Sequence, residues 1–112
     1  MNDRRIVWMG SSRDDVRRFP REARRKAGLE LRAVQRGQEP TDFKPVPSIG
    51  PGVYEIRIHA RGAYRVFYVA KFEEAIYVLH TFQKKTQKTA KQDLQIARQR
   101  YRTVQQRRQA PP

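Results

Sequence analysis

The chain has 112 residues, of which 38% are hydrophobic and 32% charged, and its formal net charge is +14. This length and composition predict one domain around a single core. Cysteine is absent, which excludes disulfides and thiolate metal sites, and with only two histidines we expect no metal site and no cofactor.

The positive charge is unevenly distributed along the chain. Residues 81–112 carry nine basic side chains and one acidic side chain, whereas residues 38–80 carry five of each. A field of one sign attracts polyanions, so we expect a nucleic-acid partner. No apolar run is as long as a membrane helix, and no apolar segment follows residues 1–5 as in a signal peptide. This predicts a cytoplasmic protein without membrane contact.

The N-terminal third predicts a strand followed by two helices. Residues 5–9 are apolar and β-prone, which is typical of a short strand. A brief helix is expected over residues 12–19, and Pro20 suits the first turn of a second helix that ends near residue 36. The predicted apolar face of the second helix consists of Ala23, Ala27, Leu31 and Val34. The two helices are expected to form an α-hairpin over residues 12–37.

The middle of the chain predicts a loop and then three strands. Residues 38–52 contain four prolines and two glycines, so they are expected to hold no regular element. The strands span residues 53–59, 64–70 and 75–82, and their short connections predict an antiparallel meander. Alternation in the first of these strands places Tyr54, Ile56 and Ile58 on one face and Glu55, Arg57 and His59 on the other.

The C-terminal segment predicts a third helix. Its packing stripe consists of Ala90, Leu94, Ala97, Tyr101 and Val104. We expect one domain over residues 1–107, followed by a disordered tail over residues 108–112. The element order is β-α-α-β-β-β-α, which predicts an α+β fold with the helices on one face of the sheet.

Residues 76–89 are the most informative segment, because an apolar strand ends there in cations and hydroxyls. A sheet holds the backbone rigid at such a point while the side chains reach solvent. The side chains delivered there are His80, Gln83, Lys84, Lys85 and Lys88. Together with Arg61 in the turn at 60–63, they are predicted to contact a phosphodiester substrate, which indicates RNA.

Two sequence patterns resemble those of a known family. They are Val53-Tyr-Glu-Ile-Arg-Ile with Tyr64-Arg-Val-Phe-Tyr, and His80-Thr-Phe-Gln-Lys-Lys-Thr with Lys88-Thr89 before the last helix. The chain resembles the RelE/HigB-like toxins of type II toxin–antitoxin systems, and in particular their phage-derived HigB-like branch. This resemblance spans nearly the whole chain in element order.

The resemblance implies a microbial RNase fold and an endoribonuclease that cleaves mRNA in the ribosomal A site. It also implies a cognate antitoxin with a helix-turn-helix domain. In this family, basic residues at the positions that match Arg57 and Arg65 belong to the catalytic surface. Some relatives carry a catalytic tyrosine near the start of the last helix, but residues 86–89 contain no tyrosine. Tyr101 belongs to the packing stripe of that helix and lies too far from its start to take this role. The assignment of the general acid and base therefore differs here.

RNA cleavage without a metal needs a base, cations that stabilise the phosphorane, and an acid. Arg57 and Arg65 are expected on neighbouring strands, where both guanidinium groups can approach one phosphate. The alternative is that Arg57 pairs with Glu55 or Glu73 and that Arg65 is a cation at the sheet edge. Like charges that face each other across strands are costly unless a ligand offsets them, which favours the catalytic interpretation.

The remaining candidates are two lysines and two histidines. Lys85 is predicted to be the catalytic cation and Lys84 a contact to the RNA backbone, with solvation as the alternative. His59 shares a face with Arg57 and fits a general base. His80 is either a substrate contact or a half-buried core histidine, since alternation places it with Ile76, Val78 and Phe82. The competing function is a non-catalytic RNA- or DNA-binding protein of the same fold.

Overall fold

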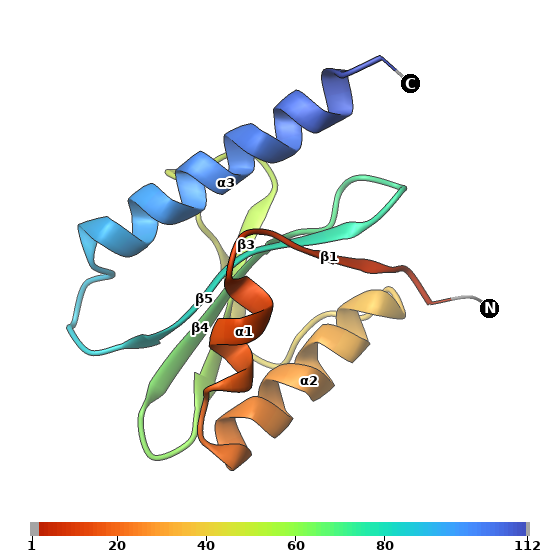
Figure 1. Ribbon diagram of the computed structural model, residues 1–112. Coiled ribbons are helices and arrows are strands. Elements are labelled where there is room, and N and C mark those ends of the chain that lie inside the picture. The colour runs from red at the N-terminus through yellow and green to blue at the C-terminus, as the bar shows by residue number, and fades with distance from the viewer. Residues whose placement is uncertain (1–2, 112) are drawn as a thin grey trace.

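The computed structural model describes residues 3–111 and contains one mixed sheet (Figure 1). Its strands are β1 (Ile6–Trp8), β2 (Phe43–Pro45), β3 (Val53–His59), β4 (Ala63–Val69) and β5 (Ile76–Lys84). Their order across the sheet is β1-β5-β4-β3-β2. β3, β4 and β5 pair antiparallel, which confirms the predicted meander, and β1 pairs parallel to β5.

Three helices accompany the sheet. α1 (Ser12–Arg17) and α2 (Arg21–Gln35) form the predicted N-terminal α-hairpin, and α3 (Lys91–Gln109) is the predicted C-terminal helix. The predicted apolar face of α2 is confirmed, because its four residues are buried. α3 continues two residues beyond position 107, so the first part of the predicted tail is helical.

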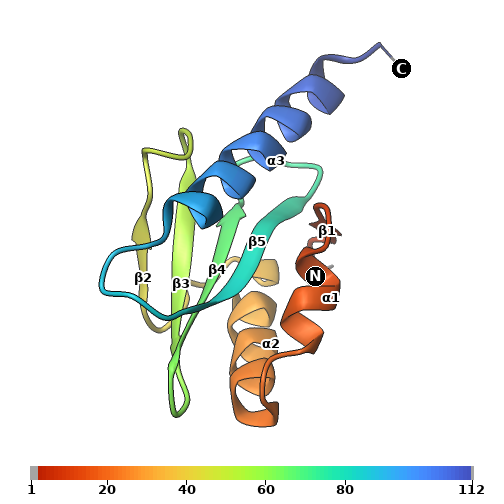
Figure 2. The ribbon, with the colours of Figure 1, turned by 60° about the vertical axis from the view of Figure 1, so that its left-hand side comes forward.

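The prediction that all helices cover one face of the sheet is wrong. α1 and α2 pack on one face, against residues such as Ile56, Val66 and Ile76. α3 packs on the opposite face through Ala97, Tyr101 and Val104. The physical reason is that the central strands are apolar on both faces, so both faces need cover. Figure 2 shows the α-hairpin and α3 on opposite sides of the sheet.

The expectation that residues 38–52 hold no regular element is also wrong. Phe43, Lys44 and Pro45 form the short edge strand β2, which pairs antiparallel with β3. A proline is tolerated there because the outer side of an edge strand needs no backbone donor.

An irregularity in β5 changes the face on which His80 lies. Phe67 pairs with His80 and Tyr68 with Val78, so Leu79 is an additional residue in β5. Leu79, His80 and Phe82 therefore face α3, whereas Ile76 and Val78 face the α-hairpin. The predicted alternation, which placed His80 with Ile76 and Val78, is wrong because a bulge shifts the phase of a strand by one residue.

α3 covers only one end of its face of the sheet. In both views the turn at 60–63 lies at the end of the sheet farthest from α3 (Figures 1 and 2). Arg57 and His59 at the end of β3 and Lys84 at the end of β5 lie toward this turn.

Candidate functional site

The strand register brings together five side chains on the face that α3 occupies, toward the end of the sheet away from α3 (Figures 1 and 2). Arg57 in β3 is directly opposite Arg65 in β4, and Arg65 is opposite Phe82 in β5. Alternation places Lys84 on the same face two residues beyond Phe82. We call this group the sheet-end site, and its members are Glu55, Arg57, His59, Arg65 and Lys84.

Arg65 is the buried centre of the sheet-end site. It lies in the central strand β4 and is 6% exposed, so the interpretation of Arg65 as a sheet-edge cation is wrong. Its Nη1 donates to the carbonyl of Tyr64 at 3.0 Å. Its Nε is buried and has no hydrogen-bond partner among the described residues. Burial lowers the pKa of Arg65 and Glu55 raises it, yet a guanidinium stays charged in proteins.

Glu55 is the carboxylate beside Arg65. One of its oxygens is 3.8 Å from Arg65 Nε and the other is 3.6 Å from Lys44 Nζ. Both distances exceed that of a hydrogen bond, so each oxygen keeps a lone pair for another donor. The side chain is buried at 4% exposure. The sequence predicts Glu55 only as a partner of Arg57, although its position on the polar face of β3 marks it as a candidate for the site.

Arg57 and His59 share a carboxylate that the sequence analysis missed. Asp42 Oδ1 accepts from Arg57 Nε at 2.9 Å, and Asp42 Oδ2 is 3.1 Å from His59 Nε2. The partner of Arg57 is thus Asp42 rather than Glu55 or Glu73. The hydrogen bond with His59 holds the pKa of Asp42 below its usual range, with Arg57 contributing in the same direction. Asp42 precedes β2 in a segment rich in proline, where no sequence pattern marks it.

The other predicted contacts surround this centre. Arg61 is exposed at the tip of the turn and has a positive φ of 55°. Gln83 is exposed and faces the α-hairpin side, because it pairs with Tyr64. Lys85 and Lys88 are exposed in the connection between β5 and α3. The register therefore places Lys84 on the same face of the sheet as Arg65, while Lys85 follows the end of the strand.

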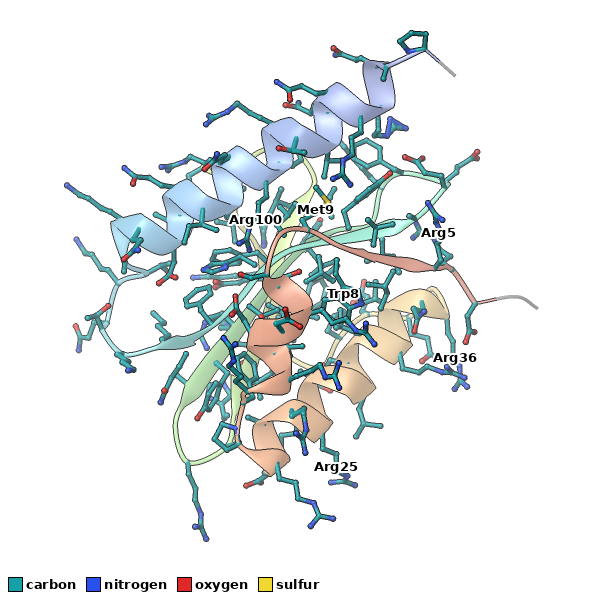
Figure 3. The ribbon with its side chains drawn as sticks, viewed as in Figure 1. Arg5, Trp8, Met9, Arg25, Arg36 and Arg100 are labelled. Carbon is teal, nitrogen blue, oxygen red and sulfur yellow. The ribbon has the colours of Figure 1, made fainter. Side chains whose placement is uncertain are left out.

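His80 lies apart from the sheet-end site in a buried polar network. Its Nε2 is 2.7 Å from Asp93 Oδ1, and its Nδ1 is 3.4 Å from Arg100 Nη1. Arg100 also donates to the Ser11 hydroxyl, and Figure 3 shows it between α3 and the start of α1. Burial lowers the pKa of His80, while the hydrogen bond with Asp93 raises it less. At 5% exposure, His80 ties α3 to β5.

Residues 3–111 contain no group of three or more histidine and acidic side chains that could hold a metal ion. In the same part of the chain, no helix is both long and apolar enough to cross a membrane.

The arrangement suits chemistry at a phosphodiester. A buried carboxylate lies beside cations from three strands. The carboxylate can accept a proton, and the guanidinium groups can stabilise charge that develops on phosphate oxygens. Arg57 and Arg65 each have their own carboxylate, so their opposed charges are already partly balanced without a ligand.

The meander, the N-terminal α-hairpin and the C-terminal helix together define a RelE-like α+β fold. Residues 14–102 match the family described as Phage derived protein Gp49-like (DUF891). The chain therefore belongs to the Gp49-like family, which is a family of RelE/HigB-like toxins. Comparison with curated proteins finds no match.

Proposed function

We propose that this protein is the toxin of a toxin–antitoxin pair and that it cleaves mRNA on the ribosome without a metal ion. The observation that carries the proposal is the buried Arg65, whose Nε has no hydrogen-bond partner within residues 3–111 and lies 3.8 Å from the carboxylate of Glu55. Such a group is held in place before substrate binds, which is what transition-state stabilisation requires. The partners would be ribosome-bound mRNA and a helix-turn-helix antitoxin, and the site of action would be the cytoplasm.

The proposed reaction breaks one phosphodiester bond. Glu55 takes the proton of the 2′-hydroxyl as the 2′-oxygen bonds to phosphorus. The bond from phosphorus to the 5′-oxygen then breaks, and the 5′-oxygen takes a proton. The products are a 2′,3′-cyclic phosphate and a 5′-hydroxyl. His59 is the other proton carrier at the sheet-end site: in its imidazolium form, with a proton on each ring nitrogen, it gives the Nδ1 proton to the 5′-oxygen.

The cations have separate roles in this proposal. Arg65 stabilises the charge of the phosphorane from below, and Arg57 holds the phosphate through its Nη groups. Lys84 lies on the face of Arg65, so it replaces Lys85 as the proposed catalytic lysine. Lys85, Lys88 and Arg61 then contact the RNA on either side, as their exposure allows, whereas Gln83 faces the other side of the sheet.

The test uses purified protein, translating ribosomes and a defined mRNA. We expect fragments with 5′-hydroxyl ends, produced only when ribosomes translate the message. Glu55→Gln keeps the shape of the side chain and should slow cleavage by about 10²-fold or more, the usual effect of losing a general base. Glu39→Gln removes an exposed carboxylate elsewhere and should cleave like wild type. Ribosome binding without any cleavage by the wild type would instead indicate a non-catalytic binding protein.

A further inference from the structure

Asp42 is joined to the sheet-end site through both of its carboxylate oxygens and its backbone. Besides the side-chain bonds to Arg57 and His59, its carbonyl accepts from the backbone N–H of Arg57 at 2.8 Å. Asp42 is therefore held in fixed register with β3. Asp42 is half-buried, so its charge is less screened than that of a fully exposed carboxylate.

The segment that carries Asp42 is itself held in place. The neighbouring Thr41 donates its backbone N–H and its hydroxyl to the two oxygens of Glu30 in α2, at 2.5 and 3.0 Å. Lys26, also in α2, donates to the carbonyl of His59 at 2.7 Å. α2 thus holds both the residue before Asp42 and the backbone of His59, so the position of Asp42 is fixed by hydrogen bonds on either side.

We infer that Asp42 is a positioning residue, which orients Arg57 and His59 toward RNA and sets the tautomer of His59. This inference rests on the proposed function. A carboxylate only accepts hydrogen bonds, so His59 carries its proton on Nε2 and presents Nδ1 to the substrate. Nδ1 is then the nitrogen that exchanges a proton with the RNA.

The same contacts determine how Arg57 meets a phosphate. Asp42 takes the Nε–H, and no hydrogen bond among residues 3–111 uses the two Nη groups of Arg57. The Nη pair is the part of the guanidinium that can bind two phosphate oxygens at once. The side chain is one third exposed, so this pair is open to a ligand.

Asp42→Asn separates positioning from simple support of the fold. An asparagine amide has one oxygen, whereas Arg57 Nε–H and His59 Nε2–H both need an acceptor. Arg57 is always a charged donor, so the oxygen should turn to Arg57 and the NH₂ to His59. His59 must then move its proton to Nδ1. Asp14→Asn, which removes an exposed carboxylate from α1, is the matched control.

The first measurement is the nitrogen NMR spectrum of His59 in the whole protein near neutral pH, where no cleavage is needed. We expect the Nε2–H tautomer in wild type and in Asp14→Asn, and the Nδ1–H tautomer in Asp42→Asn. The same tautomer in all three proteins would overturn the inference. Because this measurement does not depend on activity, it stands even if the proposed nuclease function fails.

The second measurement is ribosome-dependent cleavage in a double-mutant cycle with His59→Gln. Asp42→Asn should lower kcat on the order of 10- to 100-fold in wild type, and much less in the His59→Gln background. Circular dichroism should show the same fold in every variant. Equal effects of Asp42→Asn in both backgrounds would contradict positioning through His59. Loss of cleavage in Glu55→Gln together with full activity in Asp42→Asn would leave the proposed function intact and overturn only this inference.

Discussion

Arg65 is the residue on which the proposed chemistry depends most. It is buried in the central strand beside Glu55, and its alanine variant would leave that carboxylate buried with Lys44 alone at 3.6 Å. Removal of one partner from a buried pair typically costs about 3–5 kcal/mol, so alanine would confound activity with stability. Lysine keeps the charge and loses only the planar fork, which makes it the more informative replacement.

Arg65→Lys should therefore fold and bind ribosomes but cleave mRNA slowly. We expect a loss on the order of 10²–10³-fold in kcat, as when a transition-state donor is removed. Arg102→Lys makes the same change at an exposed position of α3 and should have no effect. Circular dichroism, ribosome co-sedimentation and cleavage rates tell these outcomes apart. A folded Arg65→Lys protein with full activity would remove Arg65 from the mechanism.

The sequence predicts some members of the site and not others, for a physical reason. Arg57 and Arg65 are predictable because strand alternation and a short hairpin turn together determine which side chains face each other. Asp42 is not, because it approaches Arg57 and His59 only after residues 38–52 fold back along β3. Lys84 and Lys85 are adjacent, and only the pairing of Lys84 with Ala63 shows which of them shares a face with Arg65.

At the scale of elements, the docking of α3 on the sheet depends on Tyr101. Its ring packs against Gly50, where a Cβ atom would lie only 2.5 Å from Tyr101 Cε2. Its hydroxyl donates to the carbonyl of Pro51 at 2.9 Å. The loop before β3 and the helix therefore hold each other in place.

Tyr101→Ala should destabilise the protein much more than Tyr101→Phe. We expect alanine to lower the free energy of unfolding by about 3 kcal/mol or more, because it leaves a cavity in the core. Phenylalanine loses only the hydrogen bond to Pro51, which is worth about 1 kcal/mol. Urea unfolding followed by circular dichroism measures both. Equal losses in the two variants would mean that the ring contributes little to docking.

The network around His80 predicts that stability depends on pH. Burial lowers the pKa of His80, so below about pH 6.5 the unfolded chain takes up a proton that the folded protein resists. The free energy of unfolding should therefore fall as the pH drops below that value. The charged groups that bear on His80 are Asp93 and Arg100 from α3 and Asp15 from α1.

The measurement is the melting temperature at about pH 7.5 and about pH 5.5, on either side of the ordinary histidine pKa. Wild type and His59→Gln, a change at the exposed histidine, should both melt lower in acid. His80→Gln should lose most of this difference, since it has no proton to gain. An unchanged acid sensitivity in His80→Gln would place its origin elsewhere.

The helices and the meander can be predicted from the sequence, whereas the faces on which the side chains of β5 lie cannot. The α2 face and the antiparallel pairings follow from local periodicity and short turns. The bulge at Leu79 does not, because residues 76–79 are apolar without alternation and give no sign of an additional residue. The placement of α3 on the second face could have been deduced, since Phe67 and Val69 are as apolar as Val66 and Tyr68.

At the scale of the whole molecule, the dominant property is the net charge of +14. Arg24 and Arg25 are exposed on α2, and Figure 3 shows Arg25 on the side of α2 away from the sheet. Arg102 is exposed on α3, on the opposite side of the sheet. Positive charge thus lies on both faces of the sheet, which suits the proposed contact with ribosomal RNA.

Binding to ribosomes should therefore weaken steeply as the salt concentration rises. Arg24→Glu with Arg25→Glu should weaken it further and flatten the dependence on salt, while circular dichroism stays the same. Arg24→Lys with Arg25→Lys keeps the charge and should bind like wild type. Co-sedimentation at a series of salt concentrations measures the slope. Binding that does not change with salt would contradict an electrostatic mode of contact.

The central claim is that the sheet-end site cleaves translated mRNA, and mapping of mRNA 5′ ends after induced expression in bacteria tests it most directly. With wild type we predict growth arrest together with new 5′-hydroxyl ends inside translated codons. With Arg65→Lys, expressed and folded to the same level, these ends should be strongly reduced. Intact mRNA in cells that the wild-type protein has fully arrested would contradict the account.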